Sequence, residues 1–416
     1  MRKSPRSHHD STLDDVLASR LARQHERHRY RRRRTTVGIG PRFQREGCEW
    51  LAFCSNDYLG LAGDPRLAEG LAEGARRFGT GGGASHLVCG HSEAHARLEA
   101  RLAEWTGCQR ALLFSSGYQA NLGVFSALLG RGDYALHDRF NHASLLDGTR
   151  LAGARLMRFA HGDAKDCGQH LAMLDSARHK LVISDGVFSM DGDVADLAAL
   201  AEQCSRHRAW LMVDDAHGFG VLGANGGGTR QSQGIDPAVV PVLVGTLGKA
   251  LGTQGAFVAG SDALIEALIQ FARPYVYTTS LSPALAWATL TSLDIVRDEP
   301  ERRDHLFTLV ERFRNGAVGL SAFGLHLMPS RTPIQPLVIG STREGGDNAV
   351  AALKLASALE AAGIWCTAIR PPTVPAGTAR LRITLSAAHD VADVDRLLEA
   401  LHDCARRLGS AQESPT

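Results

Sequence analysis

A lysine lies in a glycine-rich turn directly after an apolar segment, in the run Gly245-Thr246-Leu247-Gly248-Lys249. If residues 242–246 form a buried strand of a parallel sheet, the amine of Lys249 lies at the sheet edge where such folds bind ligands. Partial desolvation at that edge would lower the pKa of the amine and favour its reaction with an aldehyde. The run alone also fits a surface lysine in a flexible loop.

A carboxylate and an imidazole follow another apolar segment, in Asp214-Asp215-Ala216-His217. A buried carboxylate is costly unless it meets a cation. The protonated ring nitrogen of pyridoxal phosphate is such a cation, and this cofactor also needs a lysine for its aldehyde. Asp214 and Lys249 therefore predict a pyridoxal-phosphate site, although a turn aspartate beside a core histidine is the alternative.

The run from Ser115 to Asn121 reads as the end of a strand and the start of a helix. Free backbone N–H groups and the helix dipole at such a start suit a phosphate. Tyr118 and His142 are flat side chains that could stack on a ring. Two alternatives remain open, namely that the helix start is capped and binds no ligand, and that His142 is a core histidine.

The glycines of 79–85 are not followed by Lys-Ser/Thr, and no HExxH or GxSxG motif with partners occurs, so metal and serine-hydrolase chemistry lack support.

Short apolar runs alternate with helical patterns over the first two thirds of the chain and predict a mostly parallel sheet covered by helices on both faces. The expected strands are 110–114, 180–185, 210–215, 242–246 and 255–260. From about residue 300 a smaller α+β lobe is expected, with helices 304–320, 347–362 and 391–408 and strands 334–340, 364–370 and 379–385. We predict an N-terminal arm (1–48), a large cofactor-binding domain (49–295), a small C-terminal domain (296–408) and a tail (409–416).

Composition excludes several classes of protein. The 416 residues are 44% hydrophobic and 22% charged, and 46 basic against 44 acidic residues leave a net charge of +2, so no nucleic-acid partner is expected. No apolar run reaches the length of a membrane span, and the first residues lack the apolar core of a secretory signal. The eight scattered cysteines form no CxxC pair and favour reduced thiols, so we expect a cytoplasmic protein without a metal.

The N-terminal arm is rich in arginine and histidine, with the run Arg29-Tyr30-Arg31-Arg32-Arg33-Arg34. Residues 12–30 have apolar positions at helical spacing and predict a helix. The arginine run is most simply a solvated face, and a role with nucleic acid or a membrane surface has no other support in the sequence.

Taken together, these motifs resemble the α-oxoamine synthases, a group of fold-type I pyridoxal-phosphate enzymes. The resemblance covers nearly the whole chain, from about residue 13 to 402. The matching stretches are 53–60, 79–95, 113–121, 185–192, 213–220 and 245–255. Departures are few: Ala250 follows the lysine where many relatives have glycine, and Gln254 replaces a smaller residue.

The resemblance implies a role for each matching residue of the cofactor site. Lys249 would bind the cofactor aldehyde covalently and move the substrate α-proton, and Asp214 would pair with the ring nitrogen. His217 and Ser189 would contact the ring, and His142 would stack over it and meet the substrate. The residues that would help to hold the cofactor or its phosphate are Gly117, Tyr118 and Thr246.

The resemblance also implies substrate positions and a partner. Arg382 and Asn56 would receive an amino-acid carboxylate, and Arg27 and Thr373 match positions that bind the acyl substrate. Thr279 and Ser280 would reach the phosphate of a neighbouring subunit, because enzymes of this group are homodimers with sites at the interface.

Within the group, residues 368–382 are most similar to the branch that condenses L-alanine with pimeloyl-CoA or pimeloyl-acyl carrier protein in biotin biosynthesis. Two alternatives stay open. One is another reaction of the group, glycine C-acetyltransferase or 5-aminolevulinate synthase. The other is a binding protein that has lost catalysis, which the presence of Lys249, Asp214 and His217 disfavours.

Overall fold

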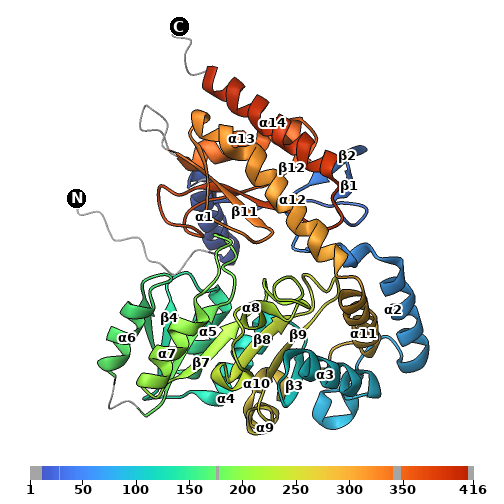
Figure 1. Cartoon of the computed structure of the whole chain (residues 1–416), viewed down its shortest axis with the longest axis vertical. Helices are drawn as coiled ribbons and strands as arrows, with labels where there is room; N and C mark the ends of the chain where they lie inside the picture. Colours follow the sequence, from blue (N-terminus) through green and yellow to red (C-terminus); the bar gives the residue numbers. More distant parts are fainter. Residues whose placement is uncertain (1–11, 28, 175–177, 341–347, 411–416) are drawn as a thin grey trace.

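The computed structural model describes residues 12–27, 29–174, 178–340 and 348–410, and Figure 1 shows a large sheet-containing part below a smaller C-terminal part. Within these ranges the large part contains a seven-stranded sheet in the order β3-β9-β8-β7-β6-β4-β5. Every neighbouring pair is parallel except the two pairs made by β9, which runs antiparallel to β3 and β8. The strands are β3 (Arg110–Phe114), β4 (Tyr134–Asp138), β5 (Arg155–Phe159), β6 (Lys180–Asp185), β7 (Trp210–Asp214), β8 (Val242–Thr246) and β9 (Ala256–Gly260).

Helices cover both faces of this sheet, as the continuous apolar strands require. Successive residues of one strand enter different cores: Leu181 and Ile183 pack in one cluster with α4 and α5, and Val182 packs in the other with α6 and α7. The predicted α/β fold with a mostly parallel sheet is confirmed. The covering helices are α4 (Gly117–Leu128), α5 (Ala143–Ala152), α6 (Ala164–Ala172), α7 (Leu197–Arg206), α9 (Asp262–Phe271) and α10 (Arg273–Val276).

The smaller part is built on a four-stranded antiparallel sheet in the order β10-β11-β14-β13. Its strands are β10 (Leu325–Leu327), β11 (Ile334–Ile339), β13 (Thr367–Ile369) and β14 (Arg380–Thr384). Its helices are α12 (Glu301–Ala317), α13 (Asn348–Ala361) and α14 (Val391–Ser410), which Figure 1 draws in orange and red above the large sheet.

A third, small sheet joins residues 42–52, which precede the large sheet in the sequence, to residues 364–365 in the C-terminal part. It contains β1 (Arg42–Arg45), β2 (Cys48–Ala52) and β12 (Ile364–Trp365), with β12 parallel to β2. The single strand expected over 364–370 is therefore two short strands in different sheets, because the chain changes sheets at Cys366. The predicted domain boundaries at 48, 295 and 408 stay predictions.

Helices α2 (Pro65–Phe78), α3 (Glu93–Thr106) and α11 (Pro283–Asp298) form the flank of the large part, and α8 (Gly228–Ser232) follows β7. Helix α1 (Leu13–Glu26) is shorter than the helix expected over 12–30 and buries none of its residues. Residues 1–11 of the predicted arm and 411–416 of the predicted tail lie outside the described residues. None of the described helices is long and apolar enough to cross a membrane.

Strands β4 and β5 were not expected from the sequence. Edge strand β5 contains two arginines among three apolar residues, and only Phe159 in it is buried. Strand β4 is buried but carries His137 and Asp138 at its end. Neither segment is the uninterrupted apolar run by which the other buried strands were recognised.

Candidate active site

A cavity of about 220 Å³ lies at the carboxyl edge of the large sheet. All eight residues expected to hold the cofactor line it, namely Gly117, Tyr118, His142, Ser189, Asp214, His217, Thr246 and Lys249. Strands β7 and β8 are neighbours, so the turns that follow them bring Asp214 and Lys249 to one space. The two residues from which the sequence predicts a cofactor site therefore line the same cavity.

Asp214 ends β7 with its side chain 7% exposed and held on both oxygens. Its Oδ1 accepts a hydrogen bond from the N–H of Ala216 (3.1 Å), and its Oδ2 accepts one from Nδ2 of Asn121 (2.7 Å). Asn121 lies one turn after Gly117 on α4 and also donates to Oγ of Ser144 (2.9 Å). These neutral donors fix the carboxylate without neutralising its charge, so it remains suited to a cationic ring nitrogen.

Lys249, which is half-buried, begins a chain of polar groups that continues into the core. Its Nζ lies 2.9 Å from Nε2 of His217, whose Nδ1 lies 2.6 Å from the hydroxyl of Tyr58. The Tyr58 hydroxyl donates to Oδ1 of Asn56 (3.3 Å), which assigns the imidazole proton to Nδ1 and leaves Nε2 as an acceptor from Lys249. Burial lowers the pKa of Lys249 to about 8, against the opposing pull of Asp214 and Asp185. Burial and the Lys249 charge also hold the pKa of His217 well below its ordinary value.

His142 is the N-cap of α5, and its ring forms one wall of the cavity. Its Nδ1 accepts from Oγ of Ser144 (2.8 Å), and its backbone N–H donates to Oδ2 of Asp185 (3.2 Å). Burial lowers the pKa of His142, so the ring is held neutral. A neutral, hydrogen-bonded imidazole is fixed in orientation and can pack flat against a ring.

The start of α4 forms the end of the cavity that suits a phosphate. Ser116 caps this helix by accepting from the N–H of Gln119, and an added Cβ at Gly117 would meet no other atom within 4 Å. Thr246 points its Oγ1 toward the carbonyl of Gly255 (3.1 Å) and accepts from the N–H of Gly248. Tyr118 is 44% exposed, and its hydroxyl donates to Asp147.

Two buried oxygens of the cavity wall test whether a polar ring fits here. Oδ1 of Asn121 and Oδ1 of Asp185 have no hydrogen-bond partner within the described residues. Orphaned buried acceptors are expected where a bound group completes the network. Together with the amine and the carboxylate, this donor and acceptor set fits pyridoxal phosphate.

Arg382 joins the smaller part of the molecule to this cavity. It lies in β14, 7% exposed, and its Nε donates to the carbonyl of Ser189 (2.5 Å), while Nη2 donates to Oδ1 of Asn56 (3.1 Å). Arg382 and Asn56 do not themselves line the cavity; Arg382 contacts Ser189, which does, and Asn56 contacts Arg382. The structure therefore places the expected carboxylate receptor directly beside the cofactor site.

Comparison with known proteins agrees with this site. Residues 49–401 match the family of class I and II aminotransferases. The chain is 57% identical over 389 residues to the 8-amino-7-oxononanoate synthase of Stutzerimonas stutzeri, covering 93% of this chain and 96% of that protein. The chain belongs to the 8-amino-7-oxononanoate synthase family. Its cofactor is therefore pyridoxal phosphate, and the protein is an enzyme of the acyltransferase type.

Solved structures of the family and its relatives share the fold. An S. paucimobilis serine palmitoyltransferase, solved with pyridoxal phosphate bound, matches with a TM-score of 0.84 at 30% identity and covers 95% of this chain and 98% of its own. An 8-amino-7-oxononanoate synthase from Francisella tularensis matches with a TM-score of 0.71 at 29% identity and covers 87% and 99%.

The two residues expected to bind the acyl substrate are separated in this member of the family. Thr373 lines a second cavity of about 800 Å³, between the arm and the C-terminal part. Arg27 is the C-cap that follows α1, is exposed and lines neither of these two cavities. Arginines further along the chain line the second cavity instead: Arg29, Arg31, Arg32, Arg34 and Arg370.

Thr279 and Ser280 lie outside both cavities. Thr279 is exposed and forms an isolated bridge with Ser85, and Ser280 is buried with an Oγ that has no partner among the described residues. Their expected contact with a neighbouring subunit stays a prediction.

Sequence reasoning missed four residues that build the cofactor site of this family member: Tyr58, Asn121, Ser144 and Asp185. Asn121 was recognisable, since it follows Gly117 by one helical turn and shares its face. Asp185 ends β6 as Asp214 ends β7, and the two are register partners. Burial and the nearby Asp214 charge hold the pKa of Asp185 well above its ordinary value.

Three histidines, His86, His91 and His95, come close enough together for a metal ion, which the sequence analysis did not anticipate. In His95, however, Nδ1 accepts from the N–H of Ser92 and Nε2 faces the carbonyl of Leu281 at 2.7 Å. Both nitrogens of that ring are therefore engaged by the protein itself, and the cluster does not offer three free ligands.

Proposed function

We propose that this chain condenses L-alanine with a pimeloyl thioester to give 8-amino-7-oxononanoate, the step of biotin biosynthesis for which its relatives are named. The observation that carries the proposal is the convergence of Lys249, Asp214 and, through Ser189, Arg382 on one cavity. In the overall reaction alanine Cα bonds to the thioester carbonyl, the thiol carrier leaves, and the alanine carboxylate departs as carbon dioxide.

The residues that would hold pyridoxal phosphate divide by chemistry. Asp214 would pair with the ring nitrogen, Lys249 would bond to the aldehyde, and the start of α4 with Thr246 would take the phosphate. His142 would pack on the ring, and His217 and Ser189 would contact its polar edge. When bound, the cofactor supplies a ring that can delocalise the electron pair left on Cα.

Lys249 would accept and return the Cα proton of the amino-acid substrate. With a pKa lowered to about 8 by burial, its amine is partly neutral near neutral pH and can accept the Cα proton and later return one. His217 lies 2.9 Å from Nζ and, with Tyr58 behind it, fixes the position of the amine. Asp214, held by Asn121 and the N–H of Ala216, would pair with the ring nitrogen.

Arg382 and Asn56 would bind the alanine carboxylate. A guanidinium matches a planar carboxylate, and Arg382 is positioned by the Ser189 carbonyl and the Asn56 side chain. The same contacts hold the amino acid against the cavity wall that carries His142 and Lys249.

The second cavity would bind the thioester substrate. Five arginines of the arm and the C-terminal part line it together with Thr373, and the positive charge of Arg31 helps burial to lower the pKa of Arg370. Pimeloyl thioesters carry a terminal carboxylate, and their CoA or carrier-protein portion carries phosphate. Both anionic ends suit this cavity.

Two further features belong to the proposal. A homodimer would cover the exposed apolar side chains of Leu87, Val88 and Tyr277 and bring Thr279 to a neighbouring subunit.

The eight cysteines are all free thiols, which suits a protein of the reducing cytoplasm.

The test is a matrix of substrates with the purified protein. L-alanine, glycine or L-serine is combined with pimeloyl-CoA, pimeloyl-acyl carrier protein, acetyl-CoA or succinyl-CoA, and the product is identified by mass. We expect 8-amino-7-oxononanoate from alanine and a pimeloyl thioester only. Turnover of glycine with a short acyl-CoA, and none with alanine, would assign the chain to the other branch of the group.

A further inference from the structure

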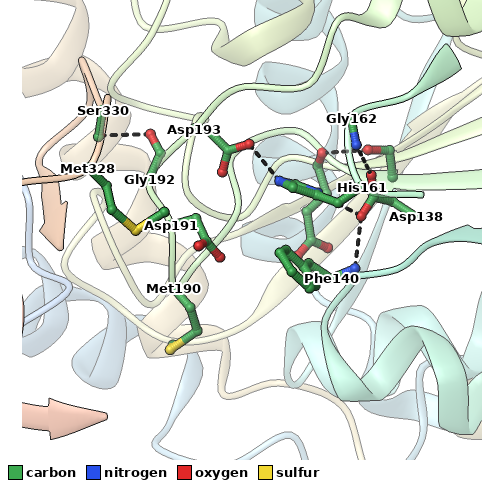
Figure 2. Close-up of polar contacts among 12 residues, drawn as sticks. Asp138, Phe140, His161, Gly162, Met190, Asp191, Gly192, Asp193, Met328 and Ser330 are labelled. Atoms are coloured by element: carbon green, nitrogen blue, oxygen red, sulfur yellow. Dashed lines mark hydrogen bonds and ion pairs between the residues drawn. The ribbon is translucent and has the colours of Figure 1, made fainter. Parts of the chain in front are cut away.

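His161 follows edge strand β5 and lies between two carboxylates at the carboxyl edge of the large sheet. Its Nδ1 is 2.9 Å from Oδ1 of Asp138, and its Nε2 is 2.8 Å from Oδ2 of Asp193 (Figure 2). Asp138 ends β4 and Asp193 lies in the loop after β6, and β5, β4 and β6 are consecutive strands of the sheet. Three separate chain segments therefore meet at one imidazole.

The first of these segments carries His142. Asp138 is nearly fully buried, accepts from the N–H groups of Phe140 and Gly162 at 2.8 Å each, and organises the turn that ends at His142. The carbonyl of Asp138 also accepts from the N–H of Asn141 (3.2 Å). The position of the ring-stacking histidine thus depends on the turn that Asp138 and His161 hold.

The second segment, which we call the 186–195 loop, carries Ser189. It is closed by hydrogen bonds from the N–H of Phe188 to the carbonyl of Asp193 (3.0 Å) and from the N–H of Gly192 to the carbonyl of Phe188 (2.8 Å). In the described residues, His161 is the one side-chain partner of the Asp193 carboxylate, whose Oδ1 is buried and unpaired. Phe188 also presents its ring to His161 in a T-shaped contact at 4.4 Å.

The C-terminal part of the molecule docks on this same loop. Ser330 donates to the carbonyl of Gly192 (2.8 Å), as Figure 2 shows, and Arg380 forms a buried ion pair with Asp191 (2.7 Å). Arg382 donates to the carbonyl of Ser189. The 186–195 loop therefore positions Arg382, the expected receptor of the carboxylate, through the Ser189 carbonyl.

The charge of His161 is set by its surroundings. Burial would lower its pKa, but hydrogen bonds and charge from Asp138 and Asp193 outweigh burial and raise it to about 10. The His161 ring is therefore protonated and positively charged at neutral pH. A neutral side chain in its place would leave two carboxylates facing each other with no cation between them.

We propose that His161 is a positioning residue: its imidazolium ties the turn that presents His142 to the 186–195 loop that presents Ser189 and seats Arg382. It touches neither cofactor nor substrate. It acts on cofactor affinity through His142 and Ser189, and on alanine affinity through the Ser189 carbonyl and Arg382. The alanine part rests on the proposed function, whereas the cofactor part does not.

The experiment compares wild type with His161→Gln and His161→Phe. Pyridoxal phosphate is titrated into cofactor-free protein to obtain Kd, and KM is measured separately for L-alanine and pimeloyl-CoA. We expect both Kd for the cofactor and KM for alanine to rise about tenfold or more, because small displacements of binding groups are costly. KM for pimeloyl-CoA should stay within about twofold, since the second cavity shares no residue with this network.

A matched control and a double variant separate positioning from general stability. His170 pairs with Asp166 on neighbouring α6 (3.8 Å), so His170→Gln should leave all three constants unchanged. Asp193→Asn alone should also weaken cofactor binding, and combining it with His161→Gln should weaken binding no further than His161→Gln alone, because both changes break the same tie to the 186–195 loop.

Unchanged Kd and alanine KM in folded His161→Gln protein would overturn the proposal. So would a rise of all three constants together, or additive losses in the double variant, since either result would indicate a merely structural role. If His161→Phe fails to fold, the glutamine variant and the double variant still decide. If the wild-type protein does not turn over L-alanine, the proposed function is wrong. The cofactor titrations would still test the role of His161 in that case.

Discussion

The two cavities present their charged side chains in opposite ways. In the cofactor cavity at the sheet edge, Asp214 is buried, Lys249 is half-buried and His142 is exposed at the cavity wall. Each of the three is fixed by a hydrogen bond to a neighbouring side chain. The second cavity is larger and gathers long arginine side chains from the arm and the C-terminal part. One of them, Arg34, forms a salt bridge with Glu360 at the cavity wall.

The proposed ligands explain why the side chains are fixed in one cavity and long and flexible in the other. A ring that takes part in chemistry needs its partners held to within fractions of an ångström, and parallel strands with buried turns supply that rigidity. A long acyl chain on a bulky carrier needs charge at its ends and room along its length. Arginines on an arm that buries little of itself supply attraction without one fixed geometry.

The largest effect that tests this contrast is expected at Lys249. Replacing Lys249 with alanine should lower turnover by about a thousandfold or more, because both the covalent link to the cofactor and the proton acceptor are lost. The visible absorption of the bound cofactor should change at the same time, while the far-ultraviolet circular dichroism is kept. Residual turnover close to wild type would mean that another base serves this cavity.

Arg382 should give the next effect. A charge-assisted hydrogen bond is worth about 1.5–3 kcal/mol, so Arg382→Ala should raise KM for L-alanine about 10- to 100-fold. KM for the thioester should change little. Arg312→Ala, which removes a surface ion pair with Asp395 in the same part of the molecule, is the control and should leave both constants alone. Equal rises of the two KM values would contradict the division of labour between the cavities.

The second cavity should respond more weakly and depend on salt. Arg31→Gln and Arg370→Gln are each expected to raise KM for pimeloyl-CoA by about three- to tenfold, and wild-type KM for that substrate should rise between about 0.05 and 0.5 M salt as the exposed charges are screened. Arg27→Gln is the matched comparison, because Arg27 lines neither cavity. A stronger effect at Arg27 than at Arg31 would restore the position first expected from the sequence.

The smallest effect concerns pH. Lys249 has its pKa lowered by burial from 10.5 to about 8, so in cofactor-free protein its amine is charged below pH 8 and neutral above it. Since only the neutral amine bonds to an aldehyde, the rate of pyridoxal phosphate uptake should rise with a midpoint near pH 8 and level off above it. Stopped-flow absorbance would show this, and a midpoint near 10.5 would indicate a solvated amine.

Much of the cofactor site could be predicted because its parts are local in sequence. Lys249 and Asp214 each follow a strand recognisable as an apolar run, and Gly117 starts a helix directly after another. Parallel strands bring such turns to a common edge, so a correct fold class already implied that these residues meet. The same rule could have reached Asp185, which ends β6.

Other parts required long-range contacts that no local pattern encodes. The contact of Arg382 with Ser189 joins residues 193 positions apart. Arg27 is not among the residues that line the second cavity, although Gln24, one turn earlier on α1, lines it. His161 follows a strand too polar to be recognised, and its two carboxylates come from segments 23 and 32 positions away.

The sequence by itself therefore determined the fold class, the family and the residues that line the cofactor cavity, since these depend on apolar runs and on short motifs at strand ends. Only the tertiary structure decided which arginines line the second cavity and what holds the loops at the cofactor cavity. Those arrangements arise from side chains meeting across different sheets and loops, where the free energy depends on distance and burial in space and not on spacing along the chain.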